Sequence, residues 1–233
     1  MFKISSGYNL IVGLSEKNDG PMSSPGFLVS KFDDEIIVSN RKKFFKKIGI
    51  TPEAVVTVGS LHKNHVQTVS IGDAGRVLGN VDGLLTQAKD LYLTLTVADC
   101  LPVYLFDPEN KVVGLLHCGW RGIVSNILEG GISNMVKEFG SLPQNILVGI
   151  GPGIAKCHFE VGKDVAEKLD SSEKFVDLKR IVKERLLTLG LDEGNMETSP
   201  DCTFCLVDKY FSFRRDKPQT PQTMVAVIGM KDG

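Results

Sequence analysis

The amino-acid sequence predicts a single layered domain over residues 1–233, of the α/β or α+β class, with a mixed central sheet flanked by helices. Several short apolar runs have the length and the β-branched composition of strands. Segments with helical periodicity lie between them, but strands and helices do not alternate strictly, as they would around a purely parallel sheet. The length of 233 residues and the hydrophobic content of 42% suit one sizeable domain.

The N-terminal part is predicted to contain, in order, a loop over residues 15–26, a strand pair over residues 27–32 and 35–40, and a short helix over residues 41–50. The loop is polar and rich in turn formers. Asp33 and Asp34 lie near the turn of the strand pair, and Gly49 ends the basic helix. The lysines of that helix are expected to form a solvated face.

Three further strands are predicted over residues 54–62, 91–100 and 111–118. The first is rich in β-branched residues and ends near His62. The other two are almost continuously apolar, which is typical of strands that are buried on both faces.

The remaining elements are predicted to be a helix over residues 123–139, a strand over residues 145–154 that runs into a glycine-rich turn, helices over residues 162–169 and 177–190, and a closing strand over residues 223–230. Gly130 and Gly131 weaken the middle of the first helix, and Gly190 ends the last one.

Charge and patterning exclude several classes of function. The net charge is −1, and no basic stripe with interleaved aromatic residues is present, so neither nucleic acid nor an anionic membrane is an expected partner. No apolar run approaches the length of a membrane span, and the N-terminus lacks the pattern of a signal peptide. We therefore expect a cytoplasmic protein whose five cysteines are free thiols or ligands.

Residues of the kind that bind metals follow three of the predicted strands: His62, Cys100 and His117. Two imidazoles and one thiolate are a plausible ligand set for a transition metal, and three protein ligands with one open position are typical of catalytic zinc. The alternatives are three unrelated buried residues, or a Cys–His hydrolase in which Cys100 is the nucleophile and either histidine is its base.

Arg121 follows the HCGW motif where a helix is predicted to begin, a position suited to binding an anion; the alternative is a surface arginine with a carboxylate partner. Trp120, the sole tryptophan, belongs either to the core or to a site where it stacks on a ring. The GIGPGI segment, residues 149–154, does not match the dinucleotide-binding fingerprint. It is interpreted as a tight turn that could line a pocket.

A second cysteine-rich pattern suggests a rival metal site. The CHFEV segment (residues 157–161) and the CTFC segment (residues 202–205) together offer three thiols and His158, which could form a structural zinc site. His65 lies three residues after His62 and is expected to be a bystander in the loop.

Seven motifs, taken in order, resemble those of the YfiH-like, laccase-domain family, whose members are called polyphenol oxidases or multifunctional purine nucleoside enzymes. They are GSLHKNHV, DGLLT, ADCLPV, LHCGWRG, IGPGIAKCHFEVG, CTFC and YFSFRRD, and they extend from about Thr57 to the C-terminus. The succession of ADCLPV and HCGWRG is the most specific part of the resemblance.

The resemblance implies a His–Cys–His metal site, which falls by motif on His62, Cys100 and His117, and it matches Arg121 to an arginine of the family. Three positions depart from the family pattern: Ser60 stands in place of a glutamine, Cys118 in place of an alanine and Phe159 in place of a tyrosine. These departures concern substrate contacts rather than the metal set.

A multicopper oxidase needs a mononuclear site and a trinuclear cluster with many imidazoles, whereas this chain has four histidines. Zinc fits better, since bound zinc lowers the pKa of water to about 7 and so makes hydroxide available for deamination of adenosine. The resemblance also implies phosphorolysis of adenosine, inosine and S-methyl-5′-thioadenosine, with Arg121 as the phosphate ligand. Asp82, Asp99 and Glu160 are candidates for proton transfer, and Asp82 and Glu160 also for substrate binding.

The expected partners are therefore a small-molecule nucleoside and phosphate, with Zn²⁺ (or Cu²⁺) as cofactor and a monomer or homodimer as the working form. Asp82 and Asp99 could instead orient a ligand histidine. Three other functions remain open: a copper-dependent polyphenol oxidase that uses the same three ligands, a binding protein with a structural metal, and a cysteine-dependent amide hydrolase.

Overall fold

The computed structural model describes the whole chain except residues 1–3, 5–6, 24–34, 60–63, 218–221 and 233. Its strands are β1 (Leu10–Leu14), β2 (Val55–Gly59), β3 (Val66–Thr68), β4 (Val77–Gly79), β5 (Gly83–Thr86), β6 (Tyr92–Val97), β7 (Leu101–Asp107), β8 (Val112–Cys118), β9 (Leu147–Ile150), β10 (Met196–Thr198) and β11 (Met224–Met230). Its α-helices are α1 (Glu35–Lys47), α2 (Trp120–Val124), α3 (Ile127–Phe139), α4 (Lys163–Lys168), α5 (Leu178–Thr188) and α6 (Phe213–Asp216).

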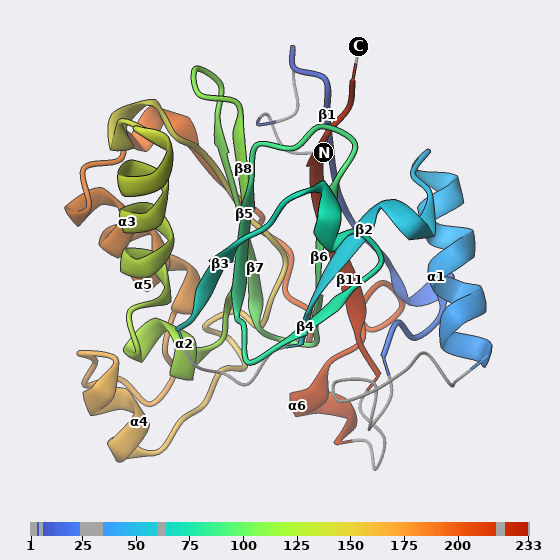
Figure 1. Cartoon of the computed structure of the whole chain (residues 1–233). Coiled ribbons are helices and arrows are strands. Elements are labelled where there is room, and N and C mark those ends of the chain that lie inside the picture. The colour runs from blue at the N-terminus through green and yellow to red at the C-terminus, as the bar shows by residue number, and fades with distance from the viewer. Residues whose placement is uncertain (1–3, 5–6, 24–34, 60–63, 218–221, 233) are drawn as a thin grey trace.

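The strands form two mixed sheets that pack face to face between helices (Figure 1). One sheet has the order β1-β11-β6-β2-β4 and the other the order β10-β9-β7-β8-β5-β3. Helix α1 covers the outer face of the first sheet, and α3 and α5 cover the outer face of the second (Figure 1). The predicted α/β class and the mixed strand directions are confirmed, but the strands divide between two sheets rather than forming one central sheet.

Strand β7 shows why the second sheet is so apolar. Val103 and Leu105 belong to the core shared with α3 and α5, whereas Tyr104 and Phe106 belong to the core between the two sheets. Successive side chains of a strand point to opposite faces, so a strand that is covered on both sides needs apolar residues at nearly every position. The prediction of doubly buried strands is confirmed for β6 and β8. The strand β7 itself was not predicted.

The strand predicted over residues 35–40 is wrong, because these residues begin helix α1. Ile37, Arg41, Phe44 and Phe45 are buried, and this spacing places them on one helical face against the first sheet. Packing of that face overrides the strand preference of the β-branched run. The partner strand predicted over residues 27–32 lies outside the described residues.

The helix predicted over residues 123–139 is divided into α2 and α3 by Asn126, whose φ of 66° lies in the left-handed region. Gly130 and Gly131 lie within α3 and do not interrupt it. A Cβ atom on Gly131 would lie 2.8 Å from Leu116 Cδ1 of β8, so this glycine allows the helix to pack closely against the sheet. The helices predicted over residues 162–169 and 177–190 are confirmed as α4 and α5.

The two adjacent glycines of α3 provide a matched pair of stability variants. Gly130→Ala is expected to raise the free energy of unfolding by about 0.5–1 kcal/mol, because alanine favours the helix and meets only ordinary contacts there. Gly131→Ala gains the same preference but is expected to lose about 1 kcal/mol overall, because it crowds the buried Leu116. Leu116 has no room to turn away, since its Cδ2 atom already fills the space beside Gly83. Urea denaturation measures both changes, and equal stabilities in the two variants would contradict this account.

Among the described residues, no helix has the length and apolar character needed to cross a bilayer.

Candidate active site

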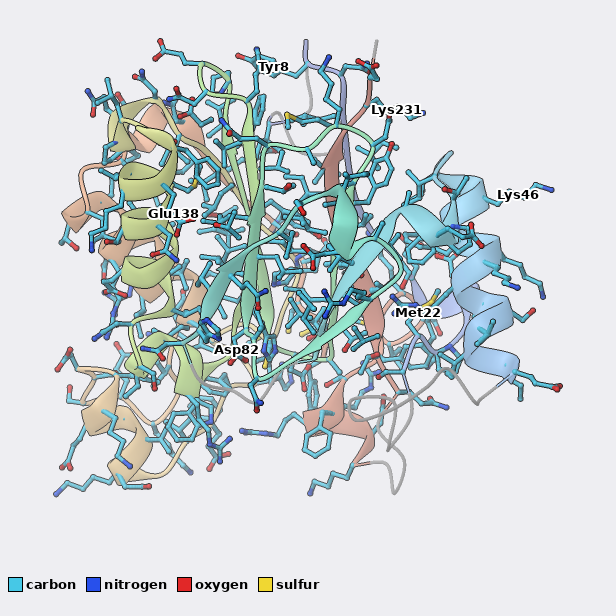
Figure 2. The ribbon with its side chains drawn as sticks, in the orientation of Figure 1. Tyr8, Met22, Lys46, Asp82, Glu138 and Lys231 are labelled. Atoms are coloured by element: carbon cyan, nitrogen blue, oxygen red, sulfur yellow. The ribbon has the colours of Figure 1, made fainter. Side chains whose placement is uncertain are left out.

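Three neighbouring strands carry the central residues of the site. In the register of the second sheet, His117 on β8 lies opposite Pro102 on β7, and Leu116 lies opposite Gly83 on β5. Cys100 stands two residues before Pro102, and Asp82 stands one residue before Gly83. Because side chains alternate along a strand, Cys100, His117 and Asp82 share the face that is turned toward the other sheet. Figure 2 shows Asp82 at the end of the molecule where α2 and α6 lie.

His117 is buried between the other two residues. Its Nδ1 atom lies 3.7 Å from Asp82 Oδ1, and its side chain also forms a hydrogen bond with Cys100. Burial opposes the charged imidazolium and is the largest single influence on the pKa of His117. The charges of Cys100 and Asp82 and their hydrogen bonds together outweigh it and raise that pKa to about 9. The buried imidazole of His117 therefore faces a carboxylate on one side and a thiol on the other.

This arrangement fits a transition metal. A thiolate and an imidazole are the donors that zinc and copper prefer, and a ligand histidine commonly directs its other nitrogen toward a carboxylate, as His117 does toward Asp82. The structure thus brings together two residues of the predicted set, Cys100 and His117. The third, His62, lies outside the described residues.

Asp99 has a different environment from that of Asp82. Its carboxylate accepts hydrogen bonds from Thr203 Oγ1 at 2.6 Å, from Ser212 Oγ at 3.1 Å and from the backbone N–H of Arg214 at 2.7 Å. Asp99 therefore fixes the segment around α6 against the start of β7. Its φ of 82° is in the left-handed region, which aspartate tolerates better than most residues, and the turn it makes presents Cys100.

Glu160 lies on the exposed rim of the same region. Its carboxylate forms an ion pair with Lys174 at 2.8 Å, and the hydrogen bond from Lys174 is the main reason why its pKa lies below the usual range. Its backbone carbonyl accepts a hydrogen bond from Arg214 Nη1 at 2.7 Å, and the Arg214 guanidinium lies 5.5 Å from the centre of the Phe159 ring. Glu160 is thus held in its ionised form, which can accept hydrogen bonds.

Arg121 lies in the first turn of α2, as predicted, and is exposed. Its guanidinium carbon is 4.5 Å from the centre of the Trp120 ring, and Trp120 is half-buried against the core. Anion binding by Arg121 stays a prediction.

The tight turn predicted over residues 149–154 is wrong. Residues 149 and 150 belong to β9, and the chain then continues beside the start of β7, where the Gly151 N–H donates to the Pro102 carbonyl at 2.8 Å and the Ile154 N–H donates to the Asp99 carbonyl at 2.9 Å. A Cβ atom on Gly153 would lie only 2.9 Å from the backbone oxygen of Asp99, so glycine allows this close approach.

The residues of the second candidate metal site, from the CHFEV and CTFC segments, also lie close together. Cys157, His158, Cys202 and Cys205 each offer one ligand atom, and these atoms all lie within 4.8 Å of one another. His65 belongs to neither group of candidate ligands, and its side chain forms a hydrogen bond with the backbone oxygen of Asn80 at 3.1 Å.

Thr203, Ser212 and Arg214 are the residues of this region whose contacts the sequence did not reveal. The motifs CTFC and YFSFRRD contain them, but their bonds to Asp99 join positions more than one hundred residues apart.

Residues 19–231 match the family described as multi-copper polyphenol oxidoreductase laccase. Purine nucleoside phosphorylase YlmD of Bacillus subtilis is 29% identical to this chain, in a match that covers 96% of this chain and 89% of that protein. A purine nucleoside phosphorylase of Deinococcus radiodurans is 31% identical, in a match that covers 85% of this chain and 79% of that protein. The crystal structure of YlmD from Geobacillus stearothermophilus has a TM-score of 0.86 at 27% identity and covers 96% of this chain and 93% of its own. The chain therefore belongs to the multi-copper polyphenol oxidoreductase laccase family, the YfiH-like family that its motifs resemble.

Proposed function

We propose that the protein is a zinc-dependent purine nucleoside phosphorylase that also deaminates adenosine. The observation that carries the proposal is the buried contact of His117 with both Cys100 and Asp82. Such a contact suits a metal-ligating histidine that a carboxylate orients. The relatives named purine nucleoside phosphorylase support the class of substrate. From the family resemblance of the motifs, we propose adenosine, inosine and S-methyl-5′-thioadenosine as the nucleoside substrates, together with phosphate.

We assign the metal to His62, Cys100 and His117, and we assign Asp82 as a positioning residue that fixes the orientation of the His117 ring. When bound, zinc polarises substrate oxygens and makes hydroxide available near neutral pH. Three protein ligands leave one coordination position open, as catalysis requires.

The distribution of histidines argues against a multicopper oxidase. The chain has four histidines, and a trinuclear copper cluster beside a mononuclear site would need more. His65 forms a hydrogen bond with the backbone at Asn80, and His158 lies among three cysteines of another cluster. Only two histidines are therefore left for the site at Cys100.

The proposed phosphorolysis needs an anion-binding group beside the ribose. Arg121 is exposed in the first turn of α2, which begins two residues after β8 ends, and stacking on Trp120 holds its guanidinium. Glu160, kept ionised by Lys174, is suited to accept a hydrogen bond from a ribose hydroxyl.

Arg121→Ala is expected to raise the KM for phosphate about 10–100-fold, because charge-assisted hydrogen bonds of about 1.5–3 kcal/mol are lost. Deamination uses water rather than phosphate, so the ratio of phosphorolysis to deamination should fall by about tenfold or more. Initial rates with inosine and adenosine measure this ratio. Arg180→Ala, which removes another exposed arginine far along the chain on α5, is the matched control. An unchanged KM for phosphate would show that another group binds the anion.

The function itself is tested by measuring metal content together with turnover of adenosine, with and without phosphate. We expect zinc that Cys100→Ser removes, inosine and ammonia from adenosine, and ribose 1-phosphate only when phosphate is present. Catechol oxidation that requires copper, with nucleosides left unchanged, would overturn the proposal in favour of an oxidase. Activity that survives chelation but is lost on thiol modification would instead identify Cys100 as a nucleophile.

A further inference from the structure

We propose that Cys157, His158, Cys202 and Cys205 form a second metal site, a closed structural zinc site that fastens the loop after β9 to the segment that leads into α6. The site shares no residue with the proposed catalytic set and does not depend on the nucleoside activity. Its four ligand atoms lie within 4.8 Å of one another, although they come from two stretches of chain about 45 residues apart.

The distances within the cluster match a tetrahedral zinc centre. With zinc–sulfur bonds of about 2.3 Å and zinc–nitrogen bonds of about 2.0 Å, tetrahedral angles place two sulfur ligands about 3.8 Å apart and a sulfur and a nitrogen about 3.5 Å apart. The Cys157 Sγ atom lies 3.9 Å from Cys202 Sγ and 3.6 Å from Cys205 Sγ. The His158 Nδ1 atom lies 3.1 Å from Cys157 Sγ and 3.3 Å from Cys205 Sγ.

The surrounding backbone is arranged to support a thiolate at Cys202. The backbone N–H of Ala155 donates to its Sγ atom at 3.3 Å, and the N–H groups of Phe204 and Cys205 also donate to it. Hydrogen bonds of this kind orient and stabilise sulfur ligands of metals. The two-residue spacing between Cys202 and Cys205 is the usual spacing of zinc-binding cysteine pairs.

The imidazole of His158 and the charge of the cluster are also accounted for. The His158 ring stacks on the Phe204 ring, with centroids 3.9 Å apart and an angle of 14° between the planes, so its Nδ1 atom is held toward the sulfur atoms. Three thiolates and a divalent zinc ion leave one negative charge. The largely buried ammonium of Lys179 interacts electrostatically with Cys202 and Cys157 and so offsets that charge.

The identity of the four ligands indicates zinc and a structural role. Three cysteines and one histidine form a known zinc set, and four protein ligands close the coordination shell, so no position is left for a substrate. A disulfide would explain the cluster less well, because Cys157 approaches both other thiols rather than one, and His158 faces the same centre.

The site would stabilise one wall of the active site. Thr203, which lies between two of the ligands, donates to the Asp99 carboxylate, and Arg214, farther along the same segment, bonds to both Asp99 and Glu160. Metal at the cluster therefore fixes the segment that holds Asp99, the neighbour of Cys100.

The test measures the zinc content of the full-length, reduced protein and of three variants. Cys205→Ser is expected to lose about one zinc per chain that Cys100→Ser retains, and Lys156→Ala, which changes the exposed neighbour of Cys157, is expected to keep all of its zinc. With cobalt in place of zinc, Cys205→Ser should lose most of the thiolate-to-metal charge-transfer absorption. Zinc content that is unaffected by Cys205→Ser, after the metal-free protein has been given zinc, overturns the proposal.

A measurement on the unchanged chain guards against variants that fail to fold. Cys157 and Cys205 are exposed, so a thiol reagent can reach both sulfur atoms when no metal is bound to them. We expect their modification, followed by mass spectrometry, to be at least tenfold slower in the zinc-loaded protein and to become fast after chelation. Rapid modification before chelation, or a disulfide between these cysteines in protein purified without air, contradicts a metal site.

Discussion

Replacing His117 with alanine is expected to reduce the proposed inosine phosphorolysis by about a thousandfold or more, because the proposed catalytic metal would supply several kcal/mol of transition-state stabilisation. His117 is buried against Cys100 and Asp82, so alanine removes both the proposed metal ligand and its contact with the Asp82 carboxylate. The measurement is kcat/KM for inosine with saturating phosphate, together with circular dichroism to verify the fold.

Asp82→Asn is the graded companion to this variant. It keeps the size of the side chain but removes the charge beside His117 Nδ1, so we expect a loss of about 10–100-fold in activity or metal affinity.

Full activity in His117→Ala would contradict the assignment of the active site. A His117→Ala chain that unfolds and binds less metal would indicate a structural role for that metal.

Replacing Asp99 with alanine is expected to lower the free energy of unfolding by about 3 kcal/mol. The substitution leaves two buried hydroxyl groups, of Thr203 and Ser212, and the N–H of Arg214 without their acceptor, at about 1 kcal/mol each. Alanine also tolerates the left-handed φ at this position less well than aspartate does. Urea denaturation monitored by fluorescence or circular dichroism gives the change.

Asp99→Asn separates the two contributions to this loss. Asparagine tolerates the same backbone conformation and keeps one oxygen acceptor, so its destabilisation should be clearly smaller than that of alanine. A change of less than about 0.5 kcal/mol in Asp99→Ala would show that the bonds to Asp99 do not hold the segment around α6.

The grouping of Cys100 with His117 was predicted from their residue types at the ends of apolar runs and from the family motifs. The hairpin of β7 and β8 that brings the two residues together was not predicted. The hydrogen bonds of Asp99 could not be predicted, because their donors lie 104 to 115 positions away. A proton-transfer role was open for Asp99 from its position in the motif, whereas its carboxylate is engaged by three donors.

The division of the strands between two sheets also could not be predicted from local sequence patterns. A strand that is buried on both faces has the same composition whether it is covered by helices or by another sheet. Strands β6 and β7 are consecutive in the chain, yet β6 pairs with β11 and β2, whereas β7 pairs with β8 and β9. In helix α1 the element type itself was predicted wrongly. Its β-branched start suggested a strand, although its buried positions follow a helical period.

The position of β11 in the first sheet has a consequence for biosynthesis. This strand lies between β1 and β6 and pairs Leu10 of β1 with Met230. During translation β1 therefore has no partner in this sheet until β11, more than 200 residues later in the chain, has left the ribosome. Until then the edge of β6 that pairs with β11 is also unpaired. Nascent chains halted before residue 224 expose an apolar strand edge of the kind that recruits chaperones or nucleates aggregation. Completion of this sheet is thus a late step in the folding of the chain.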